Sequence, residues 1–395
     1  MPKNDGVRLL AIGTDVALAQ PAAVAFGDAH QRQLKYASIL ERYDMVVRTM
    51  GGTRSSITAA QNFAIHTSAS RSRGLFPLDA AQLGVTLGRV SRSTVVSTED
   101  PFLCGLAGFV IARRLGLPLS LQFAGDMINN EVWMAERPLN RWLNPLGTWL
   151  IRQAQTFRVV STREREKLIG LGVNPTHVWN IGWITDFTRF LKADGSDVRK
   201  QWLGDRYTQL IVFMGRLVPQ KDLFTLIDAA RTIAPKFPQA RILIVGRGTL
   251  EGRLRAEIDR YGLNEQVLLA GAAAYEDVPS YLAAADILAL STIYEGNARV
   301  LAEAAAAGRP AVTMDVSGSR DTVLDGETGY VVPVGDARAF ADRLACLLEH
   351  PDRARHMGQR AREHVLSKYD ERRLLREFQE FWTFTAGLSA ETSPR

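Results

Sequence analysis

Short apolar runs alternate along the chain with longer segments whose apolar residues recur at helical spacing. Examples of the runs are VRLLAIG, LPLSLQF, LIVFM and DILAL. Runs of this kind are typical of strands that are buried on both faces of a sheet. Strands that alternate with helices predict an α/β protein with doubly wound parallel sheets. In such sheets, ligands bind beyond the carboxyl ends of the strands.

The chain is long enough for two domains. At 395 residues it exceeds what one hydrophobic core usually organises. The polar stretch 183–197 interrupts the alternation of strands and helices, as a linker does. We therefore expect one Rossmann-like domain over residues 1–185 and a second over residues 186–370. The segment 371–395 is expected to form a helix that crosses back onto the first domain.

One strand–loop–helix–strand unit, residues 286–314, carries two carboxylates. Glu295 lies in the predicted loop, and Glu303 lies about two turns into the predicted helix. The first-turn amides, roughly Asn297 to Val300, have no intrahelical partner and favour an anion. A ligand with a phosphate and several hydroxyl groups would suit this stretch. The alternative is a loop glutamate and a solvated helix glutamate that share no ligand.

A second loop, which follows the strand LIVFM, carries Arg216 and Lys221. Arginine binds phosphate with two hydrogen bonds and lysine acts as a point charge, so this pair suits a diphosphate. Exposed surface cations are the alternative. The turn Gly246-x-Gly248 follows the next strand, but it lacks the third glycine of a dinucleotide fingerprint. A dehydrogenase is therefore a poor match.

The basic charge is concentrated in the first half of the chain. The formal net charge is +6, and residues 1–185 hold 20 Lys and Arg against 13 Asp and Glu. This excess favours an anionic membrane surface or phosphorylated ligands, with a solvated basic face as the alternative. Residues 136–154 combine arginines with Trp142 and Trp149, which suits a membrane interface or a helix that packs its tryptophans into the core. No nucleic-acid motif accompanies the charge.

Two further features of the sequence are a candidate pocket residue and the use of cysteine. Asp126 follows the strand LPLSLQF and is a candidate pocket carboxylate, with a helix N-cap as the equal alternative. Cys104 and Cys346 lack metal-ligand spacing and suit a reducing cytosol. No apolar run approaches the roughly 18 residues of a membrane span, and no signal-peptide core begins the chain. We expect a cytoplasmic protein, with peripheral contact to the inner face of the cell membrane.

Four motifs, in order along the chain, resemble the donor domain of GT-B retaining glycosyltransferases, in particular family 4, the "group 1" transferases. They are GRLVPQK, the VGRG turn, YEGNARVLAEAAAAGRPAV with its E-x7-E spacing, and SGSRDTVLDGETGYVVP. The similarity is dense over residues 210–336. It is thinner in the first half, where LQFAGDM and VVSTREREKLIGLGV are similar to the family's acceptor domain. The resemblance implies a GT-B fold of two Rossmann-like domains that face each other across a cleft.

The resemblance also implies a role for each matching residue. Arg216 and Lys221 would hold the donor pyrophosphate, Glu303 would bind the ribose hydroxyls, and Glu295 would contact the transferred sugar. Arg216, Lys221 and Glu295 form the expected catalytic set. The other donor-binding positions would supply backbone amides or shape the cleft floor: Gly215, Gly246, Gly271, Gly296, Asn297, Arg299 and Val300. Neither a metal ion nor another cofactor is expected, because the cationic side chains and the helix dipole would stabilise the negative charge of the pyrophosphate.

The chain departs from the family pattern at three places. Ala124 stands where members usually have histidine, so any contact carried by that histidine is absent or supplied elsewhere. The Gly-Gly-rich acceptor loop that usually follows the first strand is missing. Residues 318–321 read Gly-Ser-Arg-Asp where members often have Gly-Gly-x-x-Glu.

The function that the resemblance implies is retaining transfer of a hexosyl group from a nucleotide diphosphate sugar to a hydroxyl acceptor. The expected partners are that donor and a glycan or lipid-linked acceptor, as in the assembly of cell-surface polysaccharides or glycolipids. Nucleic acid is not an expected partner. The alternative, motivated by Ala124, is a GT-B protein that binds nucleotide sugars or glycans without turnover.

Overall fold

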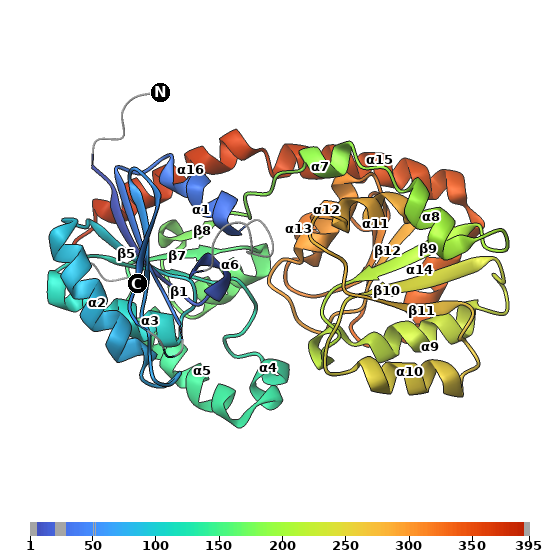
Figure 1. The fold of residues 1–395 in the computed structure, drawn as a ribbon, viewed down its shortest axis with the longest axis horizontal. Coiled ribbons are helices and arrows are strands. Elements are labelled where there is room, and N and C mark those ends of the chain that lie inside the picture. The colour runs from blue at the N-terminus through green and yellow to red at the C-terminus, as the bar shows by residue number, and fades with distance from the viewer. Residues whose placement is uncertain (1–5, 20–28, 50, 52, 391–395) are drawn as a thin grey trace. The chain divides into compact units, whose positions relative to one another are not determined.

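The chain forms two compact units. The computed structural model describes residues 6–19, 29–49, 51 and 53–390. The first unit comprises Met1–Thr185 together with Glu371–Arg395, and the second comprises Asp186–Asp370 (Figure 1). Each unit is built on its own sheet.

The first unit contains an eight-stranded sheet among its described residues, in the order β3-β4-β2-β1-β5-β6-β7-β8. All neighbouring strands are parallel except β3 and β4, which form an antiparallel pair. The strands are β1 (Arg8–Gly13), β2 (Arg42–Val47), β3 (Ser56–Ala60), β4 (Phe63–Thr67), β5 (Val95–Thr98), β6 (Leu119–Gln122), β7 (Thr156–Val159) and β8 (Val178–Asn180).

Helices cover both faces of this sheet. In β1, Leu10 points towards Gly84 and Gly88 of α2, whereas Leu9 and Ala11 point to the opposite face, where α1 and α16 pack together. Successive side chains of a strand alternate between faces, which explains the division. The helical segments are η1 (Val16–Ala19), α1 (Ala29–Ala37), α2 (Phe76–Val90), α3 (Leu103–Leu115), α4 (Glu131–Glu136), α5 (Pro138–Ile151), α6 (Thr162–Gly170), η2 (Pro175–His177) and α16 (Glu371–Ala386).

The second unit contains a fully parallel six-stranded sheet in the order β11-β10-β9-β12-β13-β14. Its strands are almost continuously apolar, because they are buried on both faces: Phe213, Leu243 and Leu288 are each fully buried. The strands are β9 (Gln209–Met214), β10 (Ala240–Val245), β11 (Val267–Gly271), β12 (Ile287–Leu290), β13 (Ala311–Met314) and β14 (Gly329–Val332).

The helices of the second unit lie in two layers. Figure 1 shows α9 and α10 on one side of the sheet and α8, α11 and α12 on the other. The helical segments are α7 (Thr188–Leu191), α8 (Ser196–Leu203), η3 (Pro219–Lys221), α9 (Leu223–Ile233), α10 (Glu251–Arg260), α11 (Val278–Ala284), α12 (Arg299–Ala306), α13 (Ser319–Thr322), α14 (Ala337–Glu349) and α15 (Pro351–Lys368). None of the described helices is long and apolar enough to cross a bilayer.

The predicted fold class, two doubly wound Rossmann-like sheets, is confirmed. The antiparallel β3–β4 hairpin was not expected, because the sequence predicted a parallel sheet. The interpretation of residues 136–154 as a helix with tryptophans in the core is wrong, because Trp142 and Trp149 on α5 are 78% and 41% exposed. The core is instead reached by Leu150 and Ile151 at the end of that helix.

Candidate active site

The strand order of the second unit identifies where a ligand can bind. The sheet begins with β9, extends through β10 to β11 on one side, and resumes with β12 on the other side of β9. The loops that follow β9 and β12 therefore leave the sheet side by side in opposite directions. This topological switch point is where open α/β sheets bind their ligands. The charged residues predicted to bind the donor all lie on these two loops or on the helix after the second one: Arg216, Lys221, Glu295, Arg299 and Glu303.

The two loops are joined by hydrogen bonds. The Ile293 amide donates to the Gln220 carbonyl oxygen at 3.0 Å, and the Gln220 side-chain amide donates to the Tyr294 carbonyl oxygen at 2.9 Å. The Ser291 hydroxyl donates to the Lys221 carbonyl oxygen at 3.0 Å. The loop after β9 and the loop after β12 therefore form one connected surface.

This connection brings Lys221 and Glu295 into an ion pair, although they are far apart in sequence. Their side chains are only 11% and 21% exposed. A lysine ammonium has three donors, so it can hold Glu295 and still donate to a ligand oxygen. Arg216 lies on the same loop with an exposed side chain, and its guanidinium donates to the Gln220 side chain at 3.3 Å.

The glycines after β9 and β10 allow the chain to pack closely there. A Cβ on Gly246 would lie 1.8 Å from the Gly215 carbonyl oxygen, and the φ of Gly246 is +147°. A Cβ on Gly248 would lie 2.2 Å from the Leu217 carbonyl oxygen. The Gly246-x-Gly248 turn is thus explained by backbone contact with the neighbouring loop. Gly271 accepts a hydrogen bond from the Gly246 amide at 2.7 Å, whereas Gly215 has ordinary room for a side chain.

Helix α12 begins at Arg299, directly after the loop that carries Glu295. Its N-cap residue, Ala298, provides no side-chain hydrogen bond to the first amides of the helix. These amides, which include those of Arg299 and Val300, suit an anion. Gly296 approaches the backbone of Gly318 so closely that a Cβ on Gly318 would lie 2.1 Å from the Gly296 carbonyl oxygen.

Glu303 lies just over one turn into α12, which corrects the expected two turns. The helix begins at Arg299, later than the sequence indicates, because Asn297 and Ala298 belong to the loop. The Glu303 side chain is 12% exposed and forms an ion pair with Arg299 at 3.6 Å. The carboxylate therefore lies close to the beginning of the helix.

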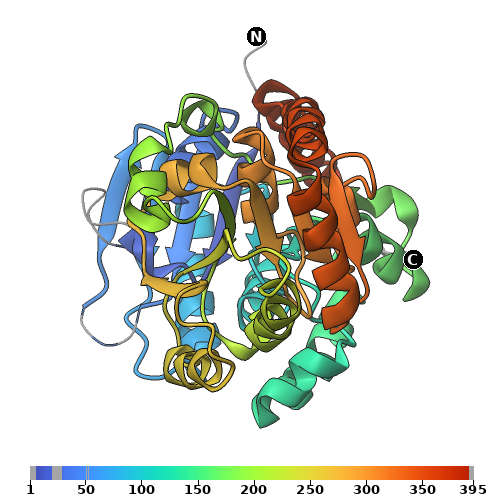
Figure 2. The same ribbon diagram turned by 90° about the vertical axis from the view of Figure 1, so that its right-hand side faces the viewer.

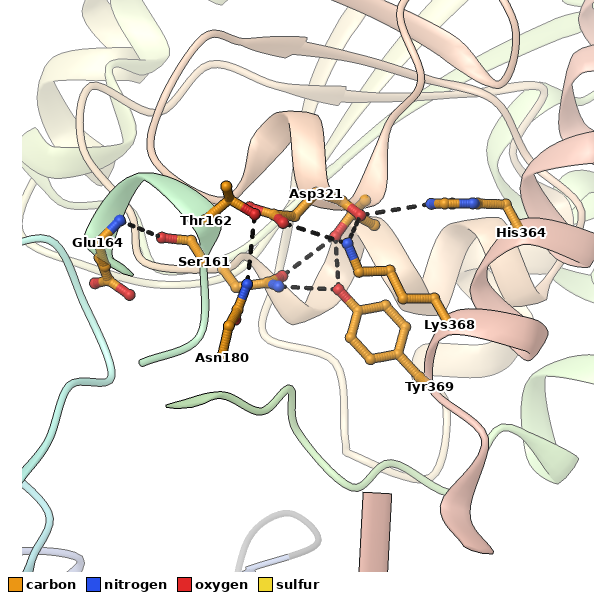
Figure 3. A network of polar contacts seen from close by, with 10 residues as sticks. Ser161, Thr162, Glu164, Asn180, Asp321, His364, Lys368 and Tyr369 are labelled. Atoms are coloured by element: carbon orange, nitrogen blue, oxygen red, sulfur yellow. Dashed lines mark hydrogen bonds and ion pairs between the residues drawn. The ribbon is translucent and has the colours of Figure 1, made fainter. Parts of the chain in front are cut away.

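The side chain of Asn297 is held inside the protein by two partners that the sequence did not indicate. Its amide nitrogen donates to the Tyr369 hydroxyl at 2.9 Å, and its oxygen accepts from Thr322 at 3.3 Å. The hydroxyls of Thr322 and Tyr369 are 2.9 Å apart, which closes the ring. Figure 3 shows Tyr369 at the centre of these contacts, next to Lys368 and Asp321. Asn297 thus fixes the loop before α12 through its side chain.

The first unit has its own switch point, between β1 and β5, and a cavity of about 210 Å³ opens there. Thr14, which follows β1, and Glu99, which follows β5, both line it. Burial raises the pKa of Glu99 to about 7. Glu99 was not expected from the sequence, because nothing in the local pattern distinguishes it from a loop glutamate. Ala124, which stands in the position of the family's histidine, also lines the cavity.

Asp126 forms an ion pair with Lys167 on α6 and is not a helix N-cap. The next helix, α4, is capped by Asn130, whose side chain accepts from the Trp133 amide at 3.0 Å. The N-cap interpretation of Asp126 is therefore wrong. Asp126 is also not among the residues that line the cavity. Its assignment to the acceptor side stays a prediction.

Comparison with known proteins identifies the second unit. Residues 196–364 match the family model of Glycosyl transferases group 1. A GDP-mannose-dependent alpha-mannosyltransferase from Mycobacterium tuberculosis is 28% identical over 305 residues, which cover 74% of each chain. A phosphatidyl-myo-inositol mannosyltransferase from Mycobacterium leprae is 34% identical over 252 residues, or 57% of this chain and 66% of that protein.

The fold is similar to that of HepE from Anabaena, whose structure was solved in complex with UDP. The TM-score is 0.75 at 19% identity, and the match covers 96% of this chain and all of the other. At this identity the likeness concerns the fold, which places the chain among the GT-B proteins.

Proposed function

Because residues 196–364 form a group 1 glycosyltransferase domain on a GT-B fold, we propose that the chain transfers a hexosyl group from a nucleotide diphosphate sugar to a hydroxyl acceptor. The observation that carries this proposal is the convergence of Lys221, Glu295 and the beginning of α12 at the β9/β12 switch point. Cations, carboxylates and the amides at a helix N-terminus in one place suit a ligand that combines phosphates with hydroxyl groups.

The proposed chemistry is governed by charge on the leaving pyrophosphate. The bond between the anomeric carbon and the phosphate oxygen breaks, a bond to the acceptor oxygen forms, and the acceptor proton passes to the departing phosphate. Arg216, Lys221 and the amides of α12 stabilise the negative charge that grows on the pyrophosphate. Glu303 binds the ribose hydroxyls, and Glu295 contacts the sugar and orients Lys221. These groups meet the charge requirement without a metal ion or cofactor.

We propose that transfer proceeds with retention at the anomeric carbon. The proposal assigns no side chain as a general base, because the departing phosphate oxygen can accept the proton from the acceptor on the same face of the sugar. The resemblance to the retaining transferases supports this course. Proton NMR of the product, recorded before the anomers equilibrate, measures the configuration; an inverted product would contradict retention.

We assign acceptor binding to the first unit, with a glycan or lipid-linked acceptor. The M. tuberculosis and M. leprae relatives are named for mannosyl transfer and, in the second case, for a phosphatidyl-inositol acceptor. Trp142 and Leu139 on α5 are 78% and 59% exposed, beside the exposed Arg137 and Arg141. Tryptophan, leucine and arginine together suit the interface of an anionic membrane. Figure 1 shows α5 at the edge of the first unit, and Figure 2 shows the same helix from the side. We therefore propose a cytoplasmic, membrane-peripheral enzyme of polysaccharide or glycolipid assembly.

The donor site is tested by two substitutions, Lys221→Ala and Glu303→Ala. Removing one preorganised donor to a developing negative charge typically lowers turnover by about 10²–10³-fold, and we expect this for Lys221→Ala. Glu303→Ala is expected to raise the KM for the donor, because the ribose contacts are lost. Donor hydrolysis and sugar transfer are measured with UDP and GDP sugars.

The matched control is Lys236→Ala, which removes an exposed lysine of the same unit. It is expected to leave both rates unchanged. Wild-type kinetics in both Lys221→Ala and Glu303→Ala would overturn the assignment of the donor site. Nucleotide-sugar binding without turnover across a broad set of acceptors would show instead that the protein is a binding module.

A further inference from the structure

The cavity of the first unit is lined by residues from seven helices and strands, and from the loops between them, at the β1/β5 switch point. Leu9 and Ala11 form its floor, on the face of the sheet that α1 and α16 cover. Its polar lining comes from the ends of the strands and from α1: Thr14, Asp15, Arg32, Gln33, Ser97, Thr98, Glu99, Gln122 and Arg158. Its aromatic lining consists of Tyr36, Tyr43, Trp183 and Trp382.

The Glu99 carboxylate is held in a fixed position at this site. It lies over the end of β1, where a Cβ on Gly13 would come within 2.5 Å of its Oε2 atom, so the glycine lets the carboxylate approach the strand closely. The Thr14 amide donates to Oε2 at 3.3 Å, and the Gln33 side-chain amide donates to Oε1 at 3.4 Å. The Tyr43 hydroxyl in turn donates to the Gln33 oxygen at 2.7 Å.

Arg158 also lines the cavity, and its guanidinium donates hydrogen bonds to other groups of the protein. Its guanidinium donates to the carbonyl oxygens of Ile181 and Gly182, both at 2.9 Å, and to the Gln122 side-chain oxygen at 3.2 Å. It also lies over the Trp183 ring, 4.5 Å from the ring centre. Its side chain is buried, so Arg158 orients Gln122 and Trp183 rather than offering a free cation to a phosphate.

When Glu99 is ionised, the lining has no net charge, because the two carboxylates of Glu99 and Asp15 balance the two guanidinium groups of Arg32 and Arg158. Amides, hydroxyls and aromatic rings make up much of the remaining wall. Carbohydrates present hydroxyls to polar groups and apolar ring faces to aromatic side chains, so they match this composition better than phosphates or amines do.

On these grounds we propose that the cavity binds a neutral, polyhydroxylated ring of the acceptor, and that the Glu99 carboxylate accepts a hydrogen bond from one of its hydroxyls. This inference rests on the proposed function and names the acceptor class and a residue that selects it. A carboxylate only accepts hydrogen bonds, whereas a protonated carboxyl also donates one. The protonation of Glu99 therefore decides which hydroxyl arrangement the pocket holds.

The surroundings of Glu99 place this change of protonation near neutral pH. Burial raises the pKa of Glu99 to about 7, against an opposing effect of the Arg32 charge, and the Asp15 and Asp100 charges raise it further. The titratable and charged groups around the site come from α1, β2, β7 and the loops after β1 and β5: Arg32, Tyr36, Tyr43, Arg158, Asp15 and Asp100. The accepting form of Glu99 therefore grows as the pH rises through about 7.

The inference is tested by sugar binding to the full chain. The probes are methyl α-D-mannopyranoside and methyl α-D-glucopyranoside, compared with mannose 6-phosphate and glucosamine, and saturation-transfer NMR gives the dissociation constants at pH 6 and pH 8. We expect a neutral glycoside to bind more tightly at pH 8 than at pH 6, and more tightly than either charged sugar. Glu99→Gln is expected to weaken binding at pH 8 about tenfold and to abolish the pH dependence, since one accepting group is lost.

Glu166→Gln is the matched control, because Glu166 is an exposed glutamate on α6 of the same unit. It is expected to bind the glycosides as the wild type does. Equal glycoside binding by Glu99→Gln and the wild type at both pH values would overturn the inference, as would tighter binding of mannose 6-phosphate.

Calorimetry with UDP and GDP on the same proteins separates this inference from the proposed function. Both nucleotides test the donor site proposed on the second unit, so at least one should bind equally to the wild type and to Glu99→Gln. If neither nucleotide binds while glycoside binding still depends on Glu99, the proposed function is contradicted and the sugar site is supported. If a nucleotide binds and no glycoside binding depends on Glu99, the sugar site fails alone.

Discussion

At the scale of single residues, the ion pair of Lys221 and Glu295 shows how the candidate donor site is prepared. Both side chains are largely buried, and a buried charge is costly unless a partner compensates it. The pair satisfies this requirement and holds the lysine ammonium at the strand ends. A single truncation there therefore has two effects, because it removes one group and leaves the other uncompensated. This is why the control for Lys221→Ala is an exposed lysine rather than Glu295→Ala.

Glu164 is a residue whose ionisation couples the fold to pH. It forms a capping box with Ser161: the Ser161 hydroxyl accepts from the Glu164 amide at 3.2 Å, as Figure 3 shows, and Glu164 Oε2 accepts from the Val160 amide at 3.2 Å. Its Oε1 atom is buried without a hydrogen-bond partner. Burial raises the pKa of Glu164 to about 8.

The raised pKa predicts a pH-dependent loss of stability. Between about 4.3, the value of an unfolded glutamate, and about 8, the folded protein holds a proton that the unfolded chain releases. The contribution of Glu164 is therefore fully present below the lower value and is lost as the pH rises towards 8. Glutamine preserves the capping box and cannot ionise. Urea unfolding should show Glu164→Gln gaining stability relative to the wild type as the pH is raised from 5 to 8.5.

The control for this pH series is Glu166→Gln, whose difference from the wild type should stay constant with pH. Glu99 also has a raised pKa and acts in the same direction, but it is present in all three proteins and cancels in the comparison. A constant difference between Glu164→Gln and the wild type would contradict the prediction.

At the scale of elements, the position of α12 depends on contacts outside its own sequence. The loop before it passes against Gly318, and Asn297 is tied to Thr322 and Tyr369. Tyr369 is the next-to-last residue of the second unit, and its ring contacts that of Phe187 near the first residue of the unit. The amides proposed to bind phosphate are therefore held by residues from both ends of the unit.

Tyr369→Phe tests this support. The substitution removes the hydroxyl that accepts from Asn297 and contacts Thr322, and it leaves the buried Asn297 amide without that partner. Unfolding free energy should fall by about 1–2 kcal/mol. The KM for the donor should rise as well, because α12 loses a fixed position. Urea unfolding and donor kinetics measure the two effects.

Tyr207→Phe is the matched control within the same unit. The Tyr207 hydroxyl is buried without a hydrogen-bond partner, so its removal should cost nothing in stability or donor binding. A Tyr369→Phe protein with wild-type stability and wild-type KM would show that the ring of hydrogen bonds does not support α12.

At the scale of the whole molecule, charge and exposed apolar groups coincide in the first unit. Residues 1–185 have a net charge of +7, whereas the remainder of the chain has −1. The exposed tryptophan and leucine of α5 lie among exposed arginines of that basic part. Attraction between opposite charges brings the protein to an anionic surface, and insertion of aromatic groups then holds it there.

Trp142→Ala is expected to weaken binding to vesicles that contain phosphatidylglycerol, while enzyme activity on a water-soluble acceptor stays unchanged. Binding should also weaken as salt is raised from 0.1 to 1 M, because the screening length falls from about 10 Å to about 3 Å. Vesicle sedimentation measures both effects. Val334→Ala, which truncates a 45% exposed valine in the second unit, is the control. Absence of binding between the wild-type protein and these vesicles at low salt would contradict the membrane proposal.

The sequence by itself determined the fold class and the location of the proposed donor site. Apolar runs of strand length and helical periodicity are local properties, so two doubly wound sheets could be predicted from them. Strand ends in a parallel sheet share one edge, so Lys221 and Glu295 could be expected in one region although they are 74 residues apart. The resemblance supplied their proposed roles.

Only the tertiary structure decided which groups meet and which strand ends are neighbours. The order β11-β10-β9-β12 places the two charged loops side by side, and sequence order does not encode it. The contact of Tyr369 with Asn297 joins segments that are distant along the chain, and so does the cavity that Glu99 and Arg158 line, so no local pattern marks these residues. Trp142 is exposed for the same reason: an amphipathic sequence shows that a helix has an apolar stripe, but only packing decides how much of it is covered.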